Sequence, residues 1–95
     1  MLNAPTNLVA KVVRKGLNTL AFEGNNPGGP HASVRYEIWR LHGDTAPFAV
    51  IATVEGEGFD DTDATPGEYY NYKVRAFDGD EASEFSNVAV VYGSI

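Results

Sequence analysis

The sequence contains no cysteine, and this absence removes several classes of protein from consideration. Without thiols the chain has neither a disulfide framework nor a thiolate zinc site, so packing alone must stabilise it. It also lacks any apolar run approaching the roughly 18 residues of a membrane span, and its first residues do not form a secretory signal. Membrane insertion is therefore not expected, and the redox compartment stays undecided.

Cations are scarce as well. The chain has 7 Lys and Arg residues against 13 Asp and Glu residues, which gives a net charge of −6. Binding to phosphate backbones or anionic lipid surfaces needs a cationic patch that releases counterions, so nucleic acid is not expected as a partner. The two histidines, His31 and His42, fall in expected loops with no cysteine or second histidine near either. We expect neither of them to bind a metal.

What the chain does contain is a series of short alternating apolar segments separated by turn residues. Its 95 residues suffice for a single domain, 1–95, with a core in about 5–92. No stretch repeats apolar residues at helical spacing over ten or more positions without a glycine or proline, so no helix is predicted. Seven strands are predicted instead. They are marked by Leu8–Val12, Leu20–Phe22, Val34–Ile38, Phe48–Val54, Phe59–Thr62, Tyr69–Phe77 and Asn87–Tyr92.

The stretch Pro66–Ala76 is the most informative part of the sequence. It opens with a turn signal and continues as a strand in which Tyr70, Tyr72 and Val74 share one face. A tyrosine four residues after a proline resembles the tyrosine corner of Greek-key sandwiches, in which the hydroxyl bonds back to upstream backbone. We therefore predict that the Tyr70 hydroxyl is hydrogen-bonded to the preceding turn.

Four further segments resemble the fibronectin type III domain in its compact bacterial form. They are the start of the first strand at Pro5–Leu8, the third strand at Tyr36–Arg40, the segment before the corner at Phe59–Thr62 and the serine-rich start of the last strand at Ser83–Val88. This resemblance covers nearly the whole chain. It implies an all-β fold, a seven-stranded immunoglobulin-like Greek-key β-sandwich of fibronectin type III type, with the first, second and fifth strands facing the other four.

Two residues depart from the family pattern. Phe22 stands where the family usually places a core tryptophan, and Ala64 stands where a leucine usually fills the space before the corner. Both changes reduce the core volume locally, and we expect Tyr69 or Phe59 to fill the space. The predicted core consists of Leu8, Leu20, Phe22, Tyr36, Ile38, Tyr72, Val74, Val88 and Val90.

The acidic run from Glu55 to Asp63 is the best candidate for metal or acid–base chemistry. Clustered carboxylates are what calcium prefers, but the spacing of these residues matches no known calcium loop. We interpret Asp60 and Asp61 as part of the strand and turn before the corner, and weak calcium binding by the run stays an alternative. Catalysis by a carboxylate pair would need a cleft, for which a small sandwich leaves no room. No catalytic, metal or cofactor residue is assigned, and the protein is not expected to be an enzyme.

Exposed aromatic residues are the better clue to a binding surface. Alternation places Trp39 on the face opposite the predicted core, so this side chain should point outward. Lys73, Arg75 and Phe77 project from the sixth strand on the same outer face, and the family arrangement pairs this strand with the third. We predict a partner-binding face made of Trp39, Lys73, Arg75 and Phe77, in which a cation stacks on the tryptophan. The alternative is that these residues only cap the sheet.

The resemblance implies a non-catalytic module, acting as a spacer or protein-interaction domain of a larger extracellular or cell-surface protein. One example would be an accessory domain of a bacterial polysaccharide-degrading enzyme. Its partners would be neighbouring domains or another protein, with polysaccharide as a further option, and no cofactor is expected. Two alternatives stay open, a complete small virion or tail decoration protein of a phage and a carbohydrate-binding module that uses exposed aromatics. A monomer is expected, because prolines at strand entrances and many acidic residues discourage edge pairing.

Overall fold

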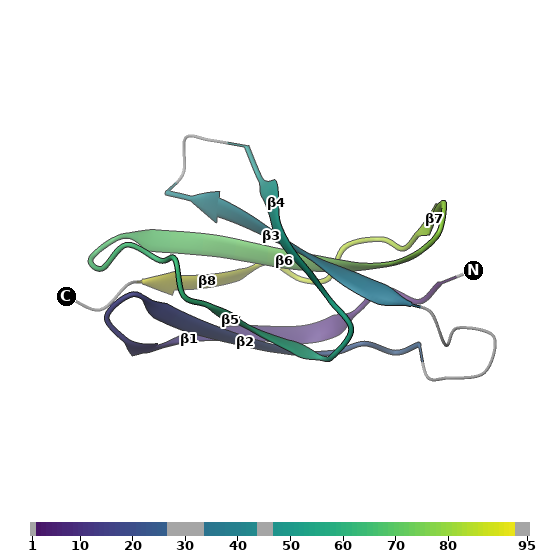
Figure 1. Cartoon of the computed structure of the whole chain (residues 1–95), viewed down its shortest axis with the longest axis horizontal. Helices are drawn as coiled ribbons and strands as arrows, with labels where there is room; N and C mark the ends of the chain where they lie inside the picture. Colours follow the sequence, from purple (N-terminus) through teal and green to yellow (C-terminus); the bar gives the residue numbers. More distant parts are fainter. Residues whose placement is uncertain (1, 27–33, 44–46, 93–95) are drawn as a thin grey trace.

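The computed structural model describes residues 2–26, 34–43 and 47–92 and shows two antiparallel sheets packed face to face (Figure 1). The smaller sheet has the strand order β1-β2-β5, and the larger has the order β4-β3-β6-β7, with β8 also paired to β6. The described residues contain no helix that could cross a membrane. The strands are β1 (Thr6–Arg14), β2 (Leu17–Glu23), β3 (Arg35–His42), β4 (Ala49–Val54), β5 (Gly58–Asp61), β6 (Tyr69–Asp78), β7 (Glu81–Ala82) and β8 (Ala89–Tyr92).

The predicted all-β sandwich and its division into two sheets are confirmed, with eight strands instead of the seven predicted. The additional strand is β7, whose two residues pair with Phe77 and Asp78 of β6. Both residues of β7 are exposed, so this strand contributes nothing to the apolar alternation that marks the others. That is why the sequence pattern contains no signal for it.

The predicted tyrosine corner is confirmed. The ring of Tyr70 is fully buried, and its hydroxyl accepts a hydrogen bond from the backbone N–H of Thr65 at 2.6 Å. The turn between them is closed by the Glu68 N–H, which donates to the Thr65 carbonyl at 3.3 Å. Gly67 supplies the left-handed backbone that this turn needs, with a φ of 84°.

The core between the sheets contains all the residues predicted for it except the two in the last strand. Val88 and Val90 are exposed, at 51% and 50%, whereas Ala89 and Val91 face inward at 8% and 7%. The prediction for this strand was wrong because the segment is apolar on both faces, and the larger valines suggested the wrong phase. Pairing with β6 sets the true phase, since Val91 lies opposite the inward-facing Tyr70.

The space left by Phe22 is filled by Tyr36 from the facing sheet. Their rings meet edge-on with centroids 5.1 Å apart, a favourable aromatic geometry. Phe59 also packs against the core, opposite Leu20 in the neighbouring strand, as predicted. The same expectation for Tyr69 was wrong, because its ring packs against Tyr92 on the outer side of the larger sheet.

Candidate functional site

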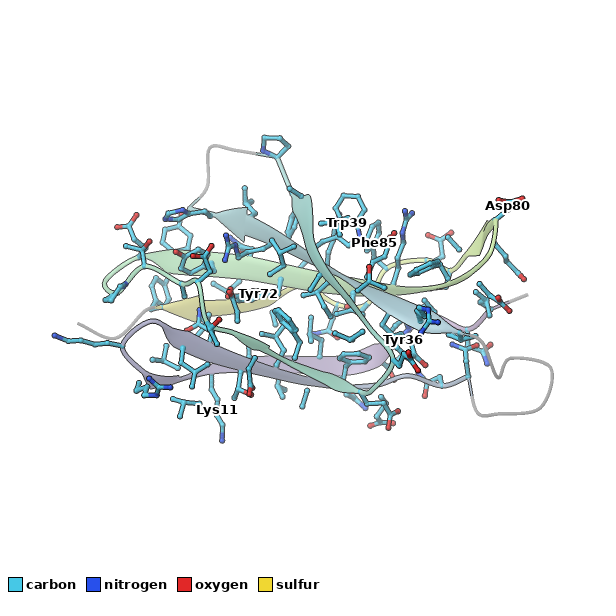
Figure 2. The ribbon with its side chains drawn as sticks, viewed as in Figure 1. Lys11, Tyr36, Trp39, Tyr72, Asp80 and Phe85 are labelled. Atoms are coloured by element: carbon cyan, nitrogen blue, oxygen red, sulfur yellow. The ribbon has the colours of Figure 1, made fainter. Side chains whose placement is uncertain are left out.

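The outer face of the larger sheet carries a group of aromatic rings and cations, here called the aromatic–cation cluster. It consists of Trp39, Phe48, Lys73, Arg75 and Phe85, and all five side chains are partly exposed. Trp39 of β3 lies directly opposite Lys73 of β6 in the sheet, which places both on one face. Trp39 and Phe85 lie together on the outer side of the sandwich (Figure 2).

The two cations sit against the rings. The Arg75 guanidinium carbon lies 5.3 Å from the ring centroid of Trp39 and 5.3 Å from that of Phe85. The Lys73 Nζ lies 4.0 Å from the Phe85 centroid, 4.4 Å from the Phe48 centroid and 6.0 Å from the Trp39 centroid. The cation–π contact predicted at Trp39 is therefore present, and each such contact at an exposed site is worth about 0.5–1 kcal/mol.

Glu37 fixes one side of the cluster. A single oxygen of its carboxylate accepts hydrogen bonds from Arg75 Nε at 2.6 Å and from the indole N–H of Trp39 at 3.2 Å. Arg75 is thus both paired and stacked, which holds its planar group in place. Lys73 differs, because no carboxylate of the described residues lies within ion-pair distance of its ammonium group.

Phe85 and Phe48 are members that the sequence prediction missed, and Phe77 is a predicted residue that lies outside the cluster. Phe77 is on the same outer face, opposite Arg35, but none of the ring contacts between described residues joins it to Trp39. The partner-binding role of the predicted face stays a prediction.

Two serines explain why Phe85 reaches the cluster. The hydroxyl of Ser86 accepts from the Val74 N–H at 3.0 Å, and that of Ser83 accepts from the Ala76 N–H at 2.9 Å. The N–H groups of the same two serines donate back to the carbonyls of these β6 residues. The segment between β7 and β8 is therefore tied to β6 at two points, with Phe85 directly before one of them. The serine-rich start of the last strand was the signal that could have indicated this.

The acidic run does not gather around one point. Asp60 and Asp61 lie in β5, as predicted, and Asp60 accepts from the Thr19 hydroxyl at 2.7 Å. Glu57 instead accepts from the backbone N–H of Gly24 at 2.7 Å, at the end of β2. Across residues 2–26, 34–43 and 47–92, no three His, Cys, Asp or Glu side chains are grouped so that they could hold a metal ion.

Asp61 belongs to a buried polar network that the sequence prediction missed. Its carboxylate accepts from the Tyr72 hydroxyl at 2.5 Å and from Arg40 Nη1 at 3.0 Å, while the Asn18 amide donates to the same tyrosine oxygen at 2.9 Å. Burial raises the pKa of Tyr72 well above its usual value, and donation to Asp61 raises it further. Burial is the largest single influence on the Arg40 pKa and lowers it, but the hydrogen bond and the charge attraction to Asp61, with smaller contributions from Tyr72 and Tyr70, together raise this pKa above its usual value.

His42 has a structural role at the edge of this region. Its Nε2 lies 3.0 Å from a carboxylate oxygen of Glu68, and its ring stacks on Tyr70 with centroids 4.6 Å apart. The other histidine, His31, lies outside the described residues. These contacts tie His42 to the tyrosine corner.

Comparison with known proteins rests on structure, because no protein-family model and no curated protein matches the sequence. A solved Fn3-like protein from Clostridium thermocellum is 24% identical with a TM-score of 0.76, over 95% of this chain and 91% of that one. The chain has the fibronectin type III fold. A β-1,2-glucanase from Parabacteroides distasonis is 20% identical with a TM-score of 0.81, over all of this chain but 13% of the glucanase.

The FN1–FN3 domains of chicken CNTN1 are also similar to this chain in structure. They are 19% identical to it with a TM-score of 0.74, over 98% of this chain and 33% of that one. This domain therefore corresponds to a small part of two of the longer chains it resembles, and to almost the whole of the Clostridium thermocellum protein.

Proposed function

We propose that this fibronectin type III domain is a non-catalytic spacer and protein-interaction module of a larger extracellular or cell-surface protein. The path of the chain supports the spacer role. The chain leads into β1 from one end of the long axis, and β8 runs towards the other end (Figure 1). The domain is 44 Å long, so neighbours joined to its two ends are held apart by that length. The match to 13% of the glucanase and 33% of the CNTN1 domains also supports a module in a longer chain.

The chemistry of the described surface supports a non-catalytic role. A groove of about 590 Å³ runs between the start of β1 and residues 85–87, and its lining includes no ionisable side chain. A second hollow, of about 350 Å³, is lined by Arg40, Asp61 and Asp63, but Arg40 and Asp61 are already paired with each other. Among the described residues, the ionisable groups with a raised pKa include Tyr36, Arg40 and Tyr72, and the last two are held in the network around Asp61. Perturbed groups of this kind stabilise a fold as readily as they serve catalysis.

The aromatic–cation cluster is the observation that carries the interaction role. Tryptophan, phenylalanine and arginine are enriched in protein interfaces, where aromatic and arginine side chains anchor the contact. A sugar would need a free ring face on Trp39, but Arg75 already stacks on this ring and Phe85 meets it edge-on. The geometry therefore supports a protein partner more than a polysaccharide.

Trp39 is the only tryptophan, so its fluorescence reports on this face directly. We expect acrylamide to quench it less when the domain is joined to its neighbouring domain than when it is alone. Phe85→Ala should reduce this difference, because the variant removes a ring that contacts Trp39. Val90→Ala, which changes an exposed residue of β8 in the same sheet, is the control and should leave it unchanged.

Soluble polysaccharides separate the two classes of partner. We expect no saturable shift of the Trp39 emission at about millimolar sugar, a range that covers weak binding. A saturable shift that is lost in Phe85→Ala would overturn the protein-partner proposal in favour of the carbohydrate-binding alternative. Equal quenching of the joined and isolated domains would also count against the proposal.

A further inference from the structure

Strand β4 forms an edge of the larger sheet, and β3 is its only strand partner among the described residues. An edge strand presents unpaired backbone N–H and C=O groups, which natural proteins usually protect with charged side chains. From Pro47 to Val54 the sequence has no charged residue, and Val50 is 45% exposed. Pro47 precedes the strand, so β4 itself contains no proline, and those of its N–H groups that point away from β3 can pair with another strand.

The edges of the smaller sheet are protected by contrast. Edge strand β1 carries Lys11 and Arg14, and edge strand β5 carries Asp60 and Asp61. These charges discourage the approach of another strand.

Strand β8, next to β6 in the larger sheet, is also uncharged. However, it is short, and β1 of the smaller sheet already lies against it. Asn87, just before this strand, accepts from the Leu8 N–H and donates to the Leu8 carbonyl, both at 2.9 Å. This side chain therefore bonds β1 as a neighbouring strand would. Among the described strands, β4 is therefore the longest edge strand without a charged residue.

A β-bulge in β4 gives this edge a symmetry of its own. The pairing with β3 shifts between Ile38 and Trp39, which lie opposite Ala52 and Val50, so Ile51 is the extra residue. Ile51 and Ala52 both pack against the core. Within the strand, positions 50 and 53 then point outward on either side of this inward pair, and 49 and 54 point inward. Just beyond the strand ends, Phe48 lies against Lys73 and Glu55 is paired with Arg35.

We propose that β4 pairs antiparallel with β4 of a second copy, about a two-fold axis between residues 51 and 52. In this register Ile51 faces Ala52, Val50 faces Thr53 and position 49 faces 54, so residues opposite each other point to the same side of the sheet. Only uncharged residues meet within 47–54, despite the net charge of −6. The contact is isologous, which allows one patch to serve both copies.

The same register brings opposite charges together at the ends of the paired strands. Glu55 of each copy faces Phe48 of the other, and Phe48 is the residue over which Lys73 Nζ lies at 4.4 Å. The Glu55 side chain is 78% exposed, and its own-chain partner is Arg35. The ammonium of Lys73 has no carboxylate in ion-pair range within the described residues. Charge complementarity thus favours a second copy as the occupant of this edge.

Pairing about this axis would form one continuous sheet with both aromatic–cation clusters on the same side. The inference goes beyond the proposed function and differs from the monomer predicted from the sequence. Val50 is not part of the cluster, so breaking the pair should leave the response of Trp39 to a neighbouring domain unchanged. The two proposals can therefore fail separately.

Sedimentation velocity from about 5 µM to about 1 mM tests the pairing, a range suited to a small and weak interface. We expect the wild-type mass to rise towards that of two chains. Val50→Lys should raise the dissociation constant more than about tenfold, because it places like charges on both paired edges. Val90→Lys is the matched control on β8, equally exposed, and should associate as the wild type does. Circular dichroism would check that both variants are folded.

A charge exchange tests the register. Glu55→Lys and Lys73→Glu should each weaken association by about two- to five-fold, and the double variant should restore it. Glu84→Lys combined with Lys73→Glu is the control and should restore nothing. The proposal is overturned by a wild type that is monomeric throughout, by association that survives Val50→Lys or is lost in Val90→Lys, or by a double variant without recovery.

Discussion

Three buried tyrosine hydroxyls show how single residues define this sandwich. Tyr70 accepts from backbone at the corner, Tyr72 donates to a buried carboxylate, and Tyr36 bonds to the Asn26 side chain. The hydroxyl of Tyr36 lies so close to Gly24 that a Cβ there would sit 2.1 Å from it. Each hydroxyl is thus satisfied in a different way, as a buried polar group must be.

Replacement of Tyr70 by phenylalanine tests the corner. The variant keeps the ring but leaves the Thr65 N–H without its acceptor, so we expect unfolding free energy to fall by about 1 kcal/mol. Urea unfolding measures the change. Tyr92→Phe is the matched control, because Tyr92 is 75% exposed and its hydroxyl is open to water. An unchanged midpoint for Tyr70→Phe would show that the corner bond contributes nothing.

At the scale of whole elements, β6 and β8 show what the sequence could and could not predict. The inward face of β6 bears Tyr70, Tyr72 and Val74, whereas its outward face includes cations, so alternation assigns both faces. β8 is apolar on both faces, and only its register with β6 decides which face is buried. That register depends on contacts between distant parts of the chain, which period-two alternation does not contain.

The residues of the candidate site also fall into some that the sequence predicts and some that it does not. Trp39, Lys73 and Arg75 meet because β3 and β6 are neighbours, which alternation and the family arrangement predict together. Phe48 and Phe85 come from segments outside the strands, where no periodicity applies. The position of Phe85 depends on serine hydroxyls bonded to β6, and an element of this kind is predictable only once its partner strand is known.

The corrected phase of β8 can be tested with two valines. Val91→Ala removes buried methyl groups, and we expect it to reduce the unfolding free energy by about 2 kcal/mol. Val90→Ala, one residue away on the exposed face, should change it by less than about 0.5 kcal/mol. Urea unfolding of the two variants gives the comparison. Equal losses, or a larger loss for Val90→Ala, would restore the phase predicted from the sequence.

At the scale of the whole molecule, the polar network joins the two sheets across the core. Asn18 and Asp61 belong to the smaller sheet, whereas Arg40 and Tyr72 belong to the larger. Tyr72 lies between the sheets (Figure 2). Its hydroxyl accepts a hydrogen bond from the Asn18 amide and donates one to the Asp61 carboxylate, both in the facing sheet. The network therefore links the stability of the entire sandwich to the protonation of one tyrosine.

This link predicts how stability changes with pH. In the unfolded chain Tyr72 ionises around its ordinary pKa of 10.0, whereas burial and Asp61 raise its pKa in the folded protein. The folded state thus holds the proton more tightly, and its contribution is fully present below about pH 10 and is lost as pH rises towards the folded value. The unfolding free energy should fall there by about 1.4 kcal/mol per pH unit for each such tyrosine.

Tyr72→Phe separates this effect from the other groups that titrate at high pH. The Tyr36 pKa is also raised by burial, so both Tyr36 and Tyr72 contribute to this decline in the wild type, whereas the variant loses the contribution of Tyr72 and keeps that of Tyr36. Urea unfolding from about pH 8 to pH 11, which spans the ordinary tyrosine pKa, should therefore show a shallower alkaline decline for Tyr72→Phe. A Tyr72→Phe slope equal to that of the wild type would mean that this hydroxyl ionises as readily in the folded protein as in the unfolded chain.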